Sequence, residues 1–208
     1  MDQYDPDRRV GLIVDEWGTW FDVEPGTNPG FLYQQNTMRD AMVAAVTLNI
    51  FNRHCDRVTM ANLAQTVNVL QAVLLTEGEK LVLTPTYHVF DLYQAHQDAR
   101  EVGCFVTAET VGTAEWKTEQ ISASASEKAG VYTVTAANLS ADRAEEIRIA
   151  GVAAKAAKAR VLSGEIHAKN DFDASPLFIR EAEVRMDGNG DMLLTLPACS
   201  VAEITISC

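Results

Sequence analysis

The chain has 208 residues, of which 47% are hydrophobic and 22% are charged. This is the composition of an ordinary globular protein, so it excludes a disordered tail, a collagen-like rod and a low-complexity linker. The formal net charge is -12, and both halves of the chain share the acidic excess. That balance argues against general affinity for nucleic acid or for an anionic membrane. The length allows one large domain or two small ones.

The sequence also carries the marks of an intracellular protein. No apolar run approaches the roughly 20 residues that a membrane-spanning helix needs. The polar start, Met1–Arg9, lacks the apolar core of a signal peptide. The four cysteines are scattered and form no Cys-x-x-Cys pair, so we expect reduced thiols rather than a disulfide framework or a zinc site.

The first half of the sequence alternates between strand and helix patterns. The predicted elements are a strand at Val10–Val14, a helix from Met38 to about Arg53, a strand at Val58–Leu63 and a helix from Pro85 towards His96. The first strand is a continuous apolar run, typical of a strand buried on both faces of a parallel sheet. Thr37 and Asp40 predict a capping box at the start of the first helix. The alternation is typical of a (β/α) sheet or barrel.

The second half favours antiparallel strands. The β-prone runs are Glu101–Ala108, Ile121–Ala125, Gly130–Ala136, Glu146–Ile149, Glu181–Met186, Met192–Leu196 and Val201–Ile206. Asp187–Asp191 predicts a hairpin turn, because Gly and Asn accept a positive φ cheaply. We interpret Ala150–Ala159 as a loop with a helical turn. The turn spacing predicts a jelly-roll-like β-sandwich over residues 99–208.

The first half is too short to close a barrel. A complete (β/α)8 barrel needs roughly 250 residues, whereas residues 1–98 supply about two βα units. Two parallel strands would leave sheet edges and a broad apolar face uncovered. The predicted fold class is therefore α/β plus all-β, with the last βα units of a larger barrel followed by the sandwich.

Candidate chemistry lies directly after the first strand, at Asp15–Trp20. The carboxyl ends of barrel strands carry the catalytic groups. A carboxylate at Glu16 beside Trp17 and Trp20 suits a sugar site, because indole faces pack on sugar C–H patches and a carboxylate can attack an anomeric carbon. On spacing alone a structural role is favoured, with Glu16 capping the next loop and both indoles filling core.

A series of motifs in one order along the chain favours the catalytic role of Glu16 over the structural one. They are Val14–Trp20, Glu24–Thr27, Phe31–Asn36, Arg39-Asp40, His54–Arg57, Met60–Val69, Thr84–Phe90, Leu162–His167, Asn170–Phe172 and Leu196–Ile204. Together they resemble the C-terminal portion of the α-L-arabinofuranosidases of glycoside hydrolase family 51. The resemblance covers nearly the whole chain and is strongest in residues 10–98.

The resemblance implies a (β/α)8 barrel with a jelly-roll-like sandwich. It implies removal of terminal non-reducing α-L-arabinofuranosyl groups from arabinan and arabinoxylan oligosaccharides, with retention of configuration. Glu16 matches the nucleophile at the end of the seventh strand. Trp20 matches a wall of the sugar subsite, and Gln65 matches a glutamine near the end of the eighth strand that hydrogen-bonds the sugar. The resemblance implies no metal or organic cofactor. It does imply a homo-oligomer and a cytoplasmic location.

One part of the family's active site has no counterpart here. The family's acid/base glutamate lies in an Asn-Glu pair after the fourth strand, and this sequence contains no Asn-Glu pair. General acid assistance is typically worth about 10²–10⁴-fold in rate. We therefore expect the polypeptide alone to be inactive or nearly so, as a piece of a longer enzyme or a truncated reading frame, with the missing N-terminal barrel portion as its partner.

Other residues have less specific interpretations. His54, Cys55 and Asp56 resemble a ligand cluster, yet a histidine at a helix end and a buried cysteine are the simpler expectation. Trp116 suits either polysaccharide stacking or a core or interdomain contact, of which the second is favoured. An alternative function for the whole chain is a non-catalytic β-sandwich module for interdomain packing, oligomerisation or weak carbohydrate binding.

Overall fold

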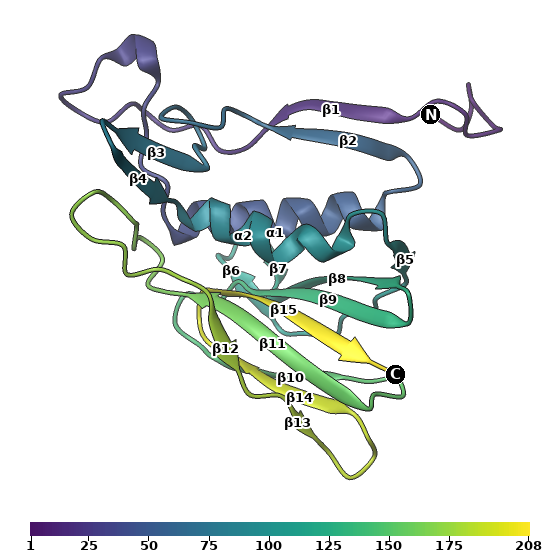
Figure 1. The fold of residues 1–208 in the computed structure, drawn as a ribbon. Coiled ribbons are helices and arrows are strands. Elements are labelled where there is room, and N and C mark those ends of the chain that lie inside the picture. The colour runs from purple at the N-terminus through teal and green to yellow at the C-terminus, as the bar shows by residue number, and fades with distance from the viewer.

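A layer of helices separates a small parallel strand pair from two antiparallel sheets (Figure 1). This computed structural model describes residues 1–208. The helical elements are η1 (Pro29–Phe31), α1 (Met38–Arg53), α2 (Pro85–Tyr93) and η2 (Gln94–His96). The strands are β1 (Leu12–Trp17), β2 (Val58–Leu63), β3 (Leu74–Glu77), β4 (Lys80–Leu83), β5 (Arg100–Val102), β6 (Thr110–Gly112), β7 (Lys117–Glu119), β8 (Ile121–Lys128), β9 (Val131–Asn138), β10 (Glu145–Ile149), β11 (Ala156–Ser163), β12 (Arg180–Ala182), β13 (Arg185–Met186), β14 (Met192–Leu196) and β15 (Ser200–Ser207).

The first half contains one complete βαβ unit, in which α1 joins the parallel strands β1 and β2. The predicted capping box begins α1: the Asp40 side chain accepts from the Thr37 backbone N–H at 2.8 Å. At α2, Pro85 occupies the first turn and the Thr84 hydroxyl accepts from the Tyr87 N–H. Both helices begin where their caps predicted. Neither has the length and apolar character that would let it cross a membrane.

The strand pair β1–β2 differs from the prediction of a strand buried on both faces. β1 begins two residues later than predicted, and its neighbours in register, Ile13 on β1 and Met60 on β2, are 55% and 53% exposed. The physical reason is that this sheet has two strands, so neither of its edges is paired and only the helix layer covers it. Large apolar side chains of β1 and β2 therefore lie in water.

The second half forms a six-stranded sheet in the order β12-β11-β15-β9-β8-β5 and a three-stranded sheet in the order β10-β14-β13. The two sheets enclose an apolar core whose largest fully buried members include Met192, Leu196, Ile204 and Ile206. The pairing within each of these sheets is antiparallel. The antiparallel prediction for this half is confirmed at this level.

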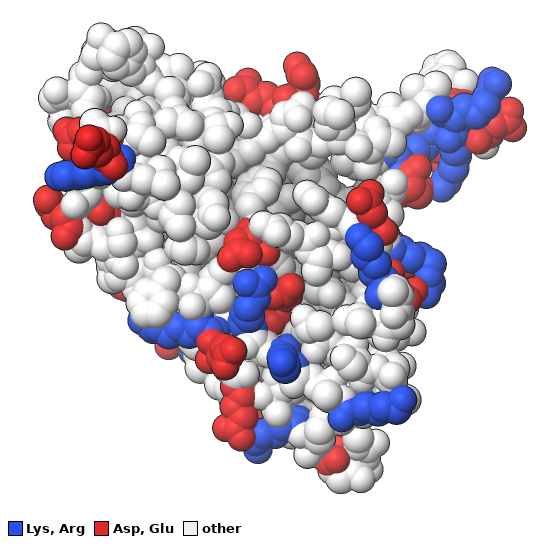
Figure 2. All heavy atoms as spheres, in the orientation of Figure 1, with Lys and Arg blue, Asp and Glu red and all other residues white.

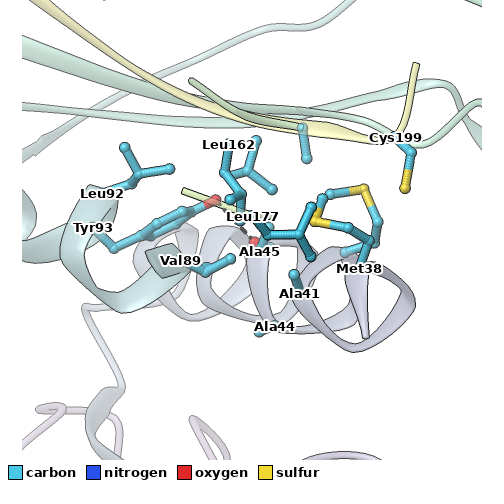
Figure 3. Close-up of a cluster of buried hydrophobic side chains, with 13 residues drawn as sticks. Met38, Ala41, Ala44, Ala45, Val89, Leu92, Tyr93, Leu162, Leu177 and Cys199 are labelled. Carbon is cyan, nitrogen blue, oxygen red and sulfur yellow. Dashed lines mark hydrogen bonds between the residues drawn. The ribbon is translucent and has the colours of Figure 1, made fainter. Parts of the chain in front are cut away.

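The opposite face of the six-stranded sheet contacts the helices. Near the start of α1 the contact is apolar, and it buries Met38, Val89, Leu162, Leu177 and Cys199 (Figure 3). Towards the other end of α1 the contact becomes polar. β8 alternates serine and alanine, with its alanines in the core between the sheets and its serines bonded to helix side chains, as Ser122 and Ser124 are to Asn49 and Asn52.

Several predictions for the second half need correction. Ala150–Ala159 does not end in a helical turn: β11 begins at Ala156 and lies inside the six-stranded sheet, paired with β15 and β12. Tertiary pairing has overridden the helical preference of an alanine-rich segment. Of Glu101–Ala108 only the start is a strand, in β5.

Two hairpins show how local pattern and tertiary pairing diverge. The turn at Asp187–Asp191 joins β13 to β14 as predicted, but Arg180–Ala182 leaves that hairpin and pairs with β11 in the other sheet. The β3–β4 hairpin was not predicted at all. Its two-residue connection is Gly78-Glu79, with Gly78 at φ 58, so a single glycine carried the turn.

Candidate active site

Glu16 lies at the carboxyl end of β1, where the ladder with β2 is irregular. Val14 pairs with Ala61 and Trp17 with Leu63, so three steps along β1 match two along β2. The extra residue is a bulge at Asp15–Glu16, a device that re-aims side chains beside active sites. Glu16 is exposed, whereas its neighbour Trp17 is half-buried against the helices.

Trp17 anchors this end of β1. Its indole meets Phe51 of α1 edge-on, with ring centroids 5.5 Å apart, and stacks near Phe90 of α2 at 6.1 Å. Aromatic pairs in this geometry contribute about 0.5–1.5 kcal/mol beyond area burial. Trp17 thus has the packing role that was expected of both indoles. Glu16, by contrast, is exposed.

Gln65 follows β2 by two residues, at the same edge of the strand pair as Glu16. The Ala64 N–H donates to the Trp17 carbonyl oxygen at 2.8 Å, which ties the two strand ends together. Gln65 is exposed and adopts a left-handed backbone with φ 61. This region is uncommon for residues other than glycine and concentrates at functional sites.

Trp20 lies on a loop that a buried polar cluster fixes in place. The indole is 66% exposed, while its neighbour Thr19 donates its hydroxyl to Asp40 Oδ1 at 2.7 Å. On the other side of Trp20, the Phe21 N–H donates to Gln34 Oε1 at 2.7 Å. Gln34 Nε2 in turn donates to the Thr19 carbonyl oxygen at 3.1 Å. The exposed Trp20 indole therefore lies on a segment whose backbone is held on both sides by hydrogen bonds.

Asp40 is the centre of this cluster and is fully buried. Gln71, after β2, donates to Asp40 Oδ1 at 3.1 Å and also bonds Thr19. Arg39 Nη2 lies 3.3 Å from Asp40 Oδ2, and its guanidinium stacks 3.7 Å over the Phe21 ring. Asp40 thus caps α1 and also holds the loop that follows β1, which joins both strand ends to one carboxylate.

Sequence reasoning found Asp40 only as a cap and missed Gln34 and Gln71. Gln71 interrupts the apolar run from Val69 to Leu75, and a lone amide inside an apolar run is the pattern of a buried, bonded polar group. The left-handed backbone of Gln71, with φ 51, had no sequence signature. Gly18 is required beside it, because a Cβ there would lie 2.6 Å from Gln71 Cγ.

Glu16 and Gln65 thus lie at one carboxyl edge of the strand pair and Trp20 lies on the loop that follows β1, and no hydrogen bond joins the three side chains. Two surface cavities lie elsewhere, in the β-rich half. No group of three or more His, Cys, Asp or Glu side chains is arranged to hold a metal ion. His54 is the C-cap of α1, as expected, but Cys55 is exposed rather than buried, because it lies in the turn before β2.

Outside this edge, His96 is a titratable side chain whose two ring nitrogens both have hydroxyl partners. Its Nδ1 lies 2.7 Å from Ser126 Oγ and its Nε2 lies 3.0 Å from Thr135 Oγ1. Burial lowers the pKa of His96 to about 4, since both partners are neutral hydroxyls. The ring is a structural link between η2 and the sheet.

The fold and the strand-edge carboxylate point to one class of protein. The chain belongs to the family of α-L-arabinofuranosidase C-terminal domains, whose profile matches residues 15–200. It corresponds to part of the length of glycoside hydrolase family 51 α-L-arabinofuranosidases.

Individual relatives make this more specific. The chain is 42% identical over 214 residues to the intracellular exo-alpha-L-arabinofuranosidase of Bacteroides ovatus, covering 99% of this chain and 41% of the relative. It superposes on the GH51 arabinofuranosidase of Xanthomonas axonopodis pv. citri with a TM-score of 0.94 and 38% identity, covering 100% of this chain and 43% of that one.

A third comparison concerns the fold alone. The Thermotoga maritima α-L-arabinofuranosidase in its arabinose complex has a TM-score of 0.82 at 22% identity, with coverage of 99% and 45%. In all three comparisons the chain spans less than half the length of the protein that it matches. The match therefore assigns the family and the fold of this portion.

Proposed function

We propose that this chain supplies the nucleophile side of a retaining α-L-arabinofuranosidase active site. Glu16 is the nucleophile, and Trp20 and Gln65 belong to the sugar subsite. The observation that carries the proposal is the joined end of the parallel pair: the Ala64 N–H to Trp17 carbonyl bond holds Glu16 and Gln65 at one carboxyl edge. Barrel enzymes build their active sites at that edge.

The proposed chemistry needs two carboxyl groups. A Glu16 carboxylate oxygen attacks the anomeric carbon of a terminal non-reducing α-L-arabinofuranosyl group as the bond to the leaving oxygen breaks. A second carboxyl group protonates that oxygen, then deprotonates the water that hydrolyses the glycosyl ester. Two inversions give net retention, and the two carboxyl groups stand about 5–5.5 Å apart in such enzymes. Trp20 offers an apolar face for the sugar ring, and Gln65 offers an amide for its hydroxyls.

The second carboxyl group is proposed to come from outside residues 1–208. Two other carboxylates of this chain lie near Glu16 in the sequence. Asp15 is its immediate neighbour in the bulge. Glu24 lies in a loop between Asp22 and Gly30 that is rich in Gly and Pro, and such a loop is a poor platform for exact positioning of a catalytic acid. Without the acid and the remaining barrel walls, the chain alone is inactive or nearly so.

Unsatisfied polar atoms support an incomplete site. Trp17 Nε1, Arg39 Nε and Gln71 Oε1 are the buried side-chain nitrogen and oxygen atoms without a hydrogen-bond partner in this chain, and all three residues surround the loop after β1. A buried polar group left unpaired costs about 1–3 kcal/mol. Further barrel segments would supply partners and would cover the exposed apolar side chains of β1 and β2.

The wider assignments form part of the same proposal. Residues 1–98 are the seventh and eighth strands and their helices in a (β/α)8 barrel, and residues 99–208 are a jelly-roll-like sandwich. The substrates are arabinan and arabinoxylan oligosaccharides, and the partner is the N-terminal barrel portion in a homo-oligomeric enzyme. The intracellular Bacteroides ovatus relative supports a cytoplasmic location.

A complementation assay tests the proposal. The chain is co-expressed with the preceding barrel segment of the Bacteroides ovatus relative, and hydrolysis of an aryl α-L-arabinofuranoside is followed. We expect activity from the pair and none from the chain alone. Glu16→Gln should lower the activity of the pair by about a thousandfold or more, because the nucleophile acts as a unit with its acid.

The matched control is Glu24→Gln, which removes a carboxylate from the same segment and should leave the rate within a few-fold. Azide added to a Glu16→Ala pair should restore turnover by entering the vacated nucleophile position. Native rates from the chain alone would overturn the missing-acid proposal. Full activity of the Glu16→Gln pair would overturn the nucleophile assignment.

A further inference from the structure

The β-rich half contains a surface groove that is separate from the strand edge of Glu16. Its volume is about 710 Å³, and it is lined by the β6–β7 hairpin and by residues 139–143 after β9. Small-molecule sites typically measure roughly 300–1,000 Å³. The groove therefore has the size of a site for an extended small ligand.

An exposed tryptophan in the β6–β7 hairpin is one of the apolar residues that line the groove. Trp116 is 80% exposed, although tryptophan is highly buried on average. The exposure is built into the turn. The Thr113 N–H donates to the Trp116 carbonyl oxygen at 2.8 Å, and the Trp116 N–H donates to Thr113 Oγ1 at 3.1 Å. Gly112, at φ +127, is required, because a Cβ there would lie 2.1 Å from that carbonyl oxygen.

The polar side of the groove is equally fixed. Arg143 donates to Glu109 Oε2 at 2.9 Å and to Gln120 Oε1 at 2.8 Å. The Ser140 hydroxyl donates to Asp142 Oδ1 at 2.8 Å. The groove thus combines an indole with donors and acceptors that are already oriented, which lowers the entropy lost when a ligand binds.

We infer that this groove binds a neutral oligosaccharide, with the Trp116 indole stacked on a sugar ring. Indole faces pack on the C–H patches of sugars, and Lys117, Asp142 and Arg143 suit hydroxyl groups. The basic groups are balanced by Asp142 and by Glu109 on Arg143, and the chain carries a net charge of -12, so an anionic ligand is disfavoured. The core of a protein interface is depleted in charged residues, unlike this groove.

The site is independent of the proposed catalytic edge, and the three tryptophans of the chain allow the two to be told apart. The indole N–H resonances of the ¹⁵N-labelled 208-residue chain are assigned by single Trp→Phe variants and titrated with α-1,5-arabinopentaose and with xylopentaose. We expect the Trp116 resonance to shift with at least one of the two. Trp116→Ala should weaken that binding by about tenfold or more, measured by calorimetry.

Two controls make the result specific. Phe105→Ala removes another exposed aromatic, outside the groove, and should leave affinity unchanged. Trp20→Ala disturbs the proposed catalytic edge and should also leave the Trp116 shift intact. The inference is overturned if neither pentasaccharide shifts Trp116. It is also overturned if Trp20→Ala abolishes binding while Trp116→Ala does not, or if Trp116→Ala alters only the sedimentation of the chain. None of these outcomes bears on the Glu16 assignment.

Discussion

The parallel pair β1–β2 and the central strands β9, β15 and β11 all contain aliphatic residues but differ in what surrounds those residues. Leu12 and Ile13 on β1 are 43% and 55% exposed, whereas Val201 and Ile204 on β15 are fully buried. The central strands each have two neighbours, while β1 and β2 have only each other. β15 also has the helices on one face and the second sheet on the other.

The difference separates self-sufficient from dependent structure. Hydrophobic stabilisation follows the apolar area removed from water, at about 25 cal/mol per Å², so the central strands contribute most of what holds this chain together. The pair β1–β2 is held by its contact with the helices through Trp17 and by its ties to the loop cluster around Asp40. It carries the proposed catalytic edge and contributes little to the core.

The largest expected effect is a matched pair of substitutions across these two regions. Ile204→Ala should destabilise the chain by about 2–5 kcal/mol, because it leaves a cavity in the closed core between the sheets. Ile13→Ala should cost less than about 1 kcal/mol, because half of that side chain is already in water. Urea unfolding followed by circular dichroism measures both. Equal costs would mean that the parallel pair belongs to the same closed core.

A second effect concerns the polar link between η2 and the sheet. The pKa of His96 is about 4 in the folded chain against about 6.5 in an unfolded one. The unfolded state therefore binds more protons between these values, and stability should be lost as the pH falls from about 6.5 to about 4. The loss should reach about 2 kcal/mol.

Unfolding free energies of the wild type and of His96→Gln, measured from pH 7 to pH 4.5, isolate this contribution. The variant keeps a side chain that can bond Ser126 and Thr135 but does not titrate, so its curve should be flatter. His54→Gln, at an exposed position, should keep the wild-type slope. Parallel curves for the wild type and His96→Gln would contradict the assignment.

A smaller effect is expected at the loop that carries Trp20. Asp40→Ala removes the acceptor shared by Thr19, Thr37 and Gln71, and should destabilise the chain by about 1–2 kcal/mol. Hydrogen exchange over residues 18–22 should accelerate well beyond the change in the central strands. The control Asp22→Ala lies at an exposed position of the same segment and should change neither. Unchanged exchange in Asp40→Ala would show that the loop does not depend on this carboxylate.

The smallest effect on stability, below about 1 kcal/mol, is expected from charging the uncovered face. Ile13→Lys with Met60→Lys places two cations on neighbouring strands in register. Exposed apolar patches promote association, so sedimentation should show less self-association in the double variant. Leu81→Lys, at an exposed apolar position on β4, serves as the control. No change in sedimentation would mean that this face does not mediate association of the chain.

Local chemistry explains which elements were predictable. The first residues of α1 and α2 follow from a capping box at Thr37 and Asp40 and from Thr84-Pro85, signals that need only a few neighbouring residues. β11 was missed because its alanines favour helix in isolation, and only pairing with β15 and β12 makes the segment a strand. Long-range pairing of this kind leaves no mark in the segment itself.

The candidate site also contains features that local sequence predicts and features that depend on tertiary contacts. Glu16 and Trp20 were accessible from their place after an apolar run and from the family motif. The bulge at Asp15–Glu16 depends on the register between β1 and β2. The second role of Asp40 depends on Gln71, thirty-one positions away, so neither was readable from spacing.

The serine–alanine alternation of β8 has a consequence for the geometry of the whole molecule. A helix resting on a smooth aliphatic surface can slip by a residue with little penalty. Here Asn49 and Asn52 donate hydrogen bonds to individual serine hydroxyls of β8. A shift of α1 by one residue along the strand would break both bonds. The six-stranded sheet therefore fixes the position of α1 along β8. Through α1 it also fixes the orientation of the strand ends next to Glu16 and Gln65.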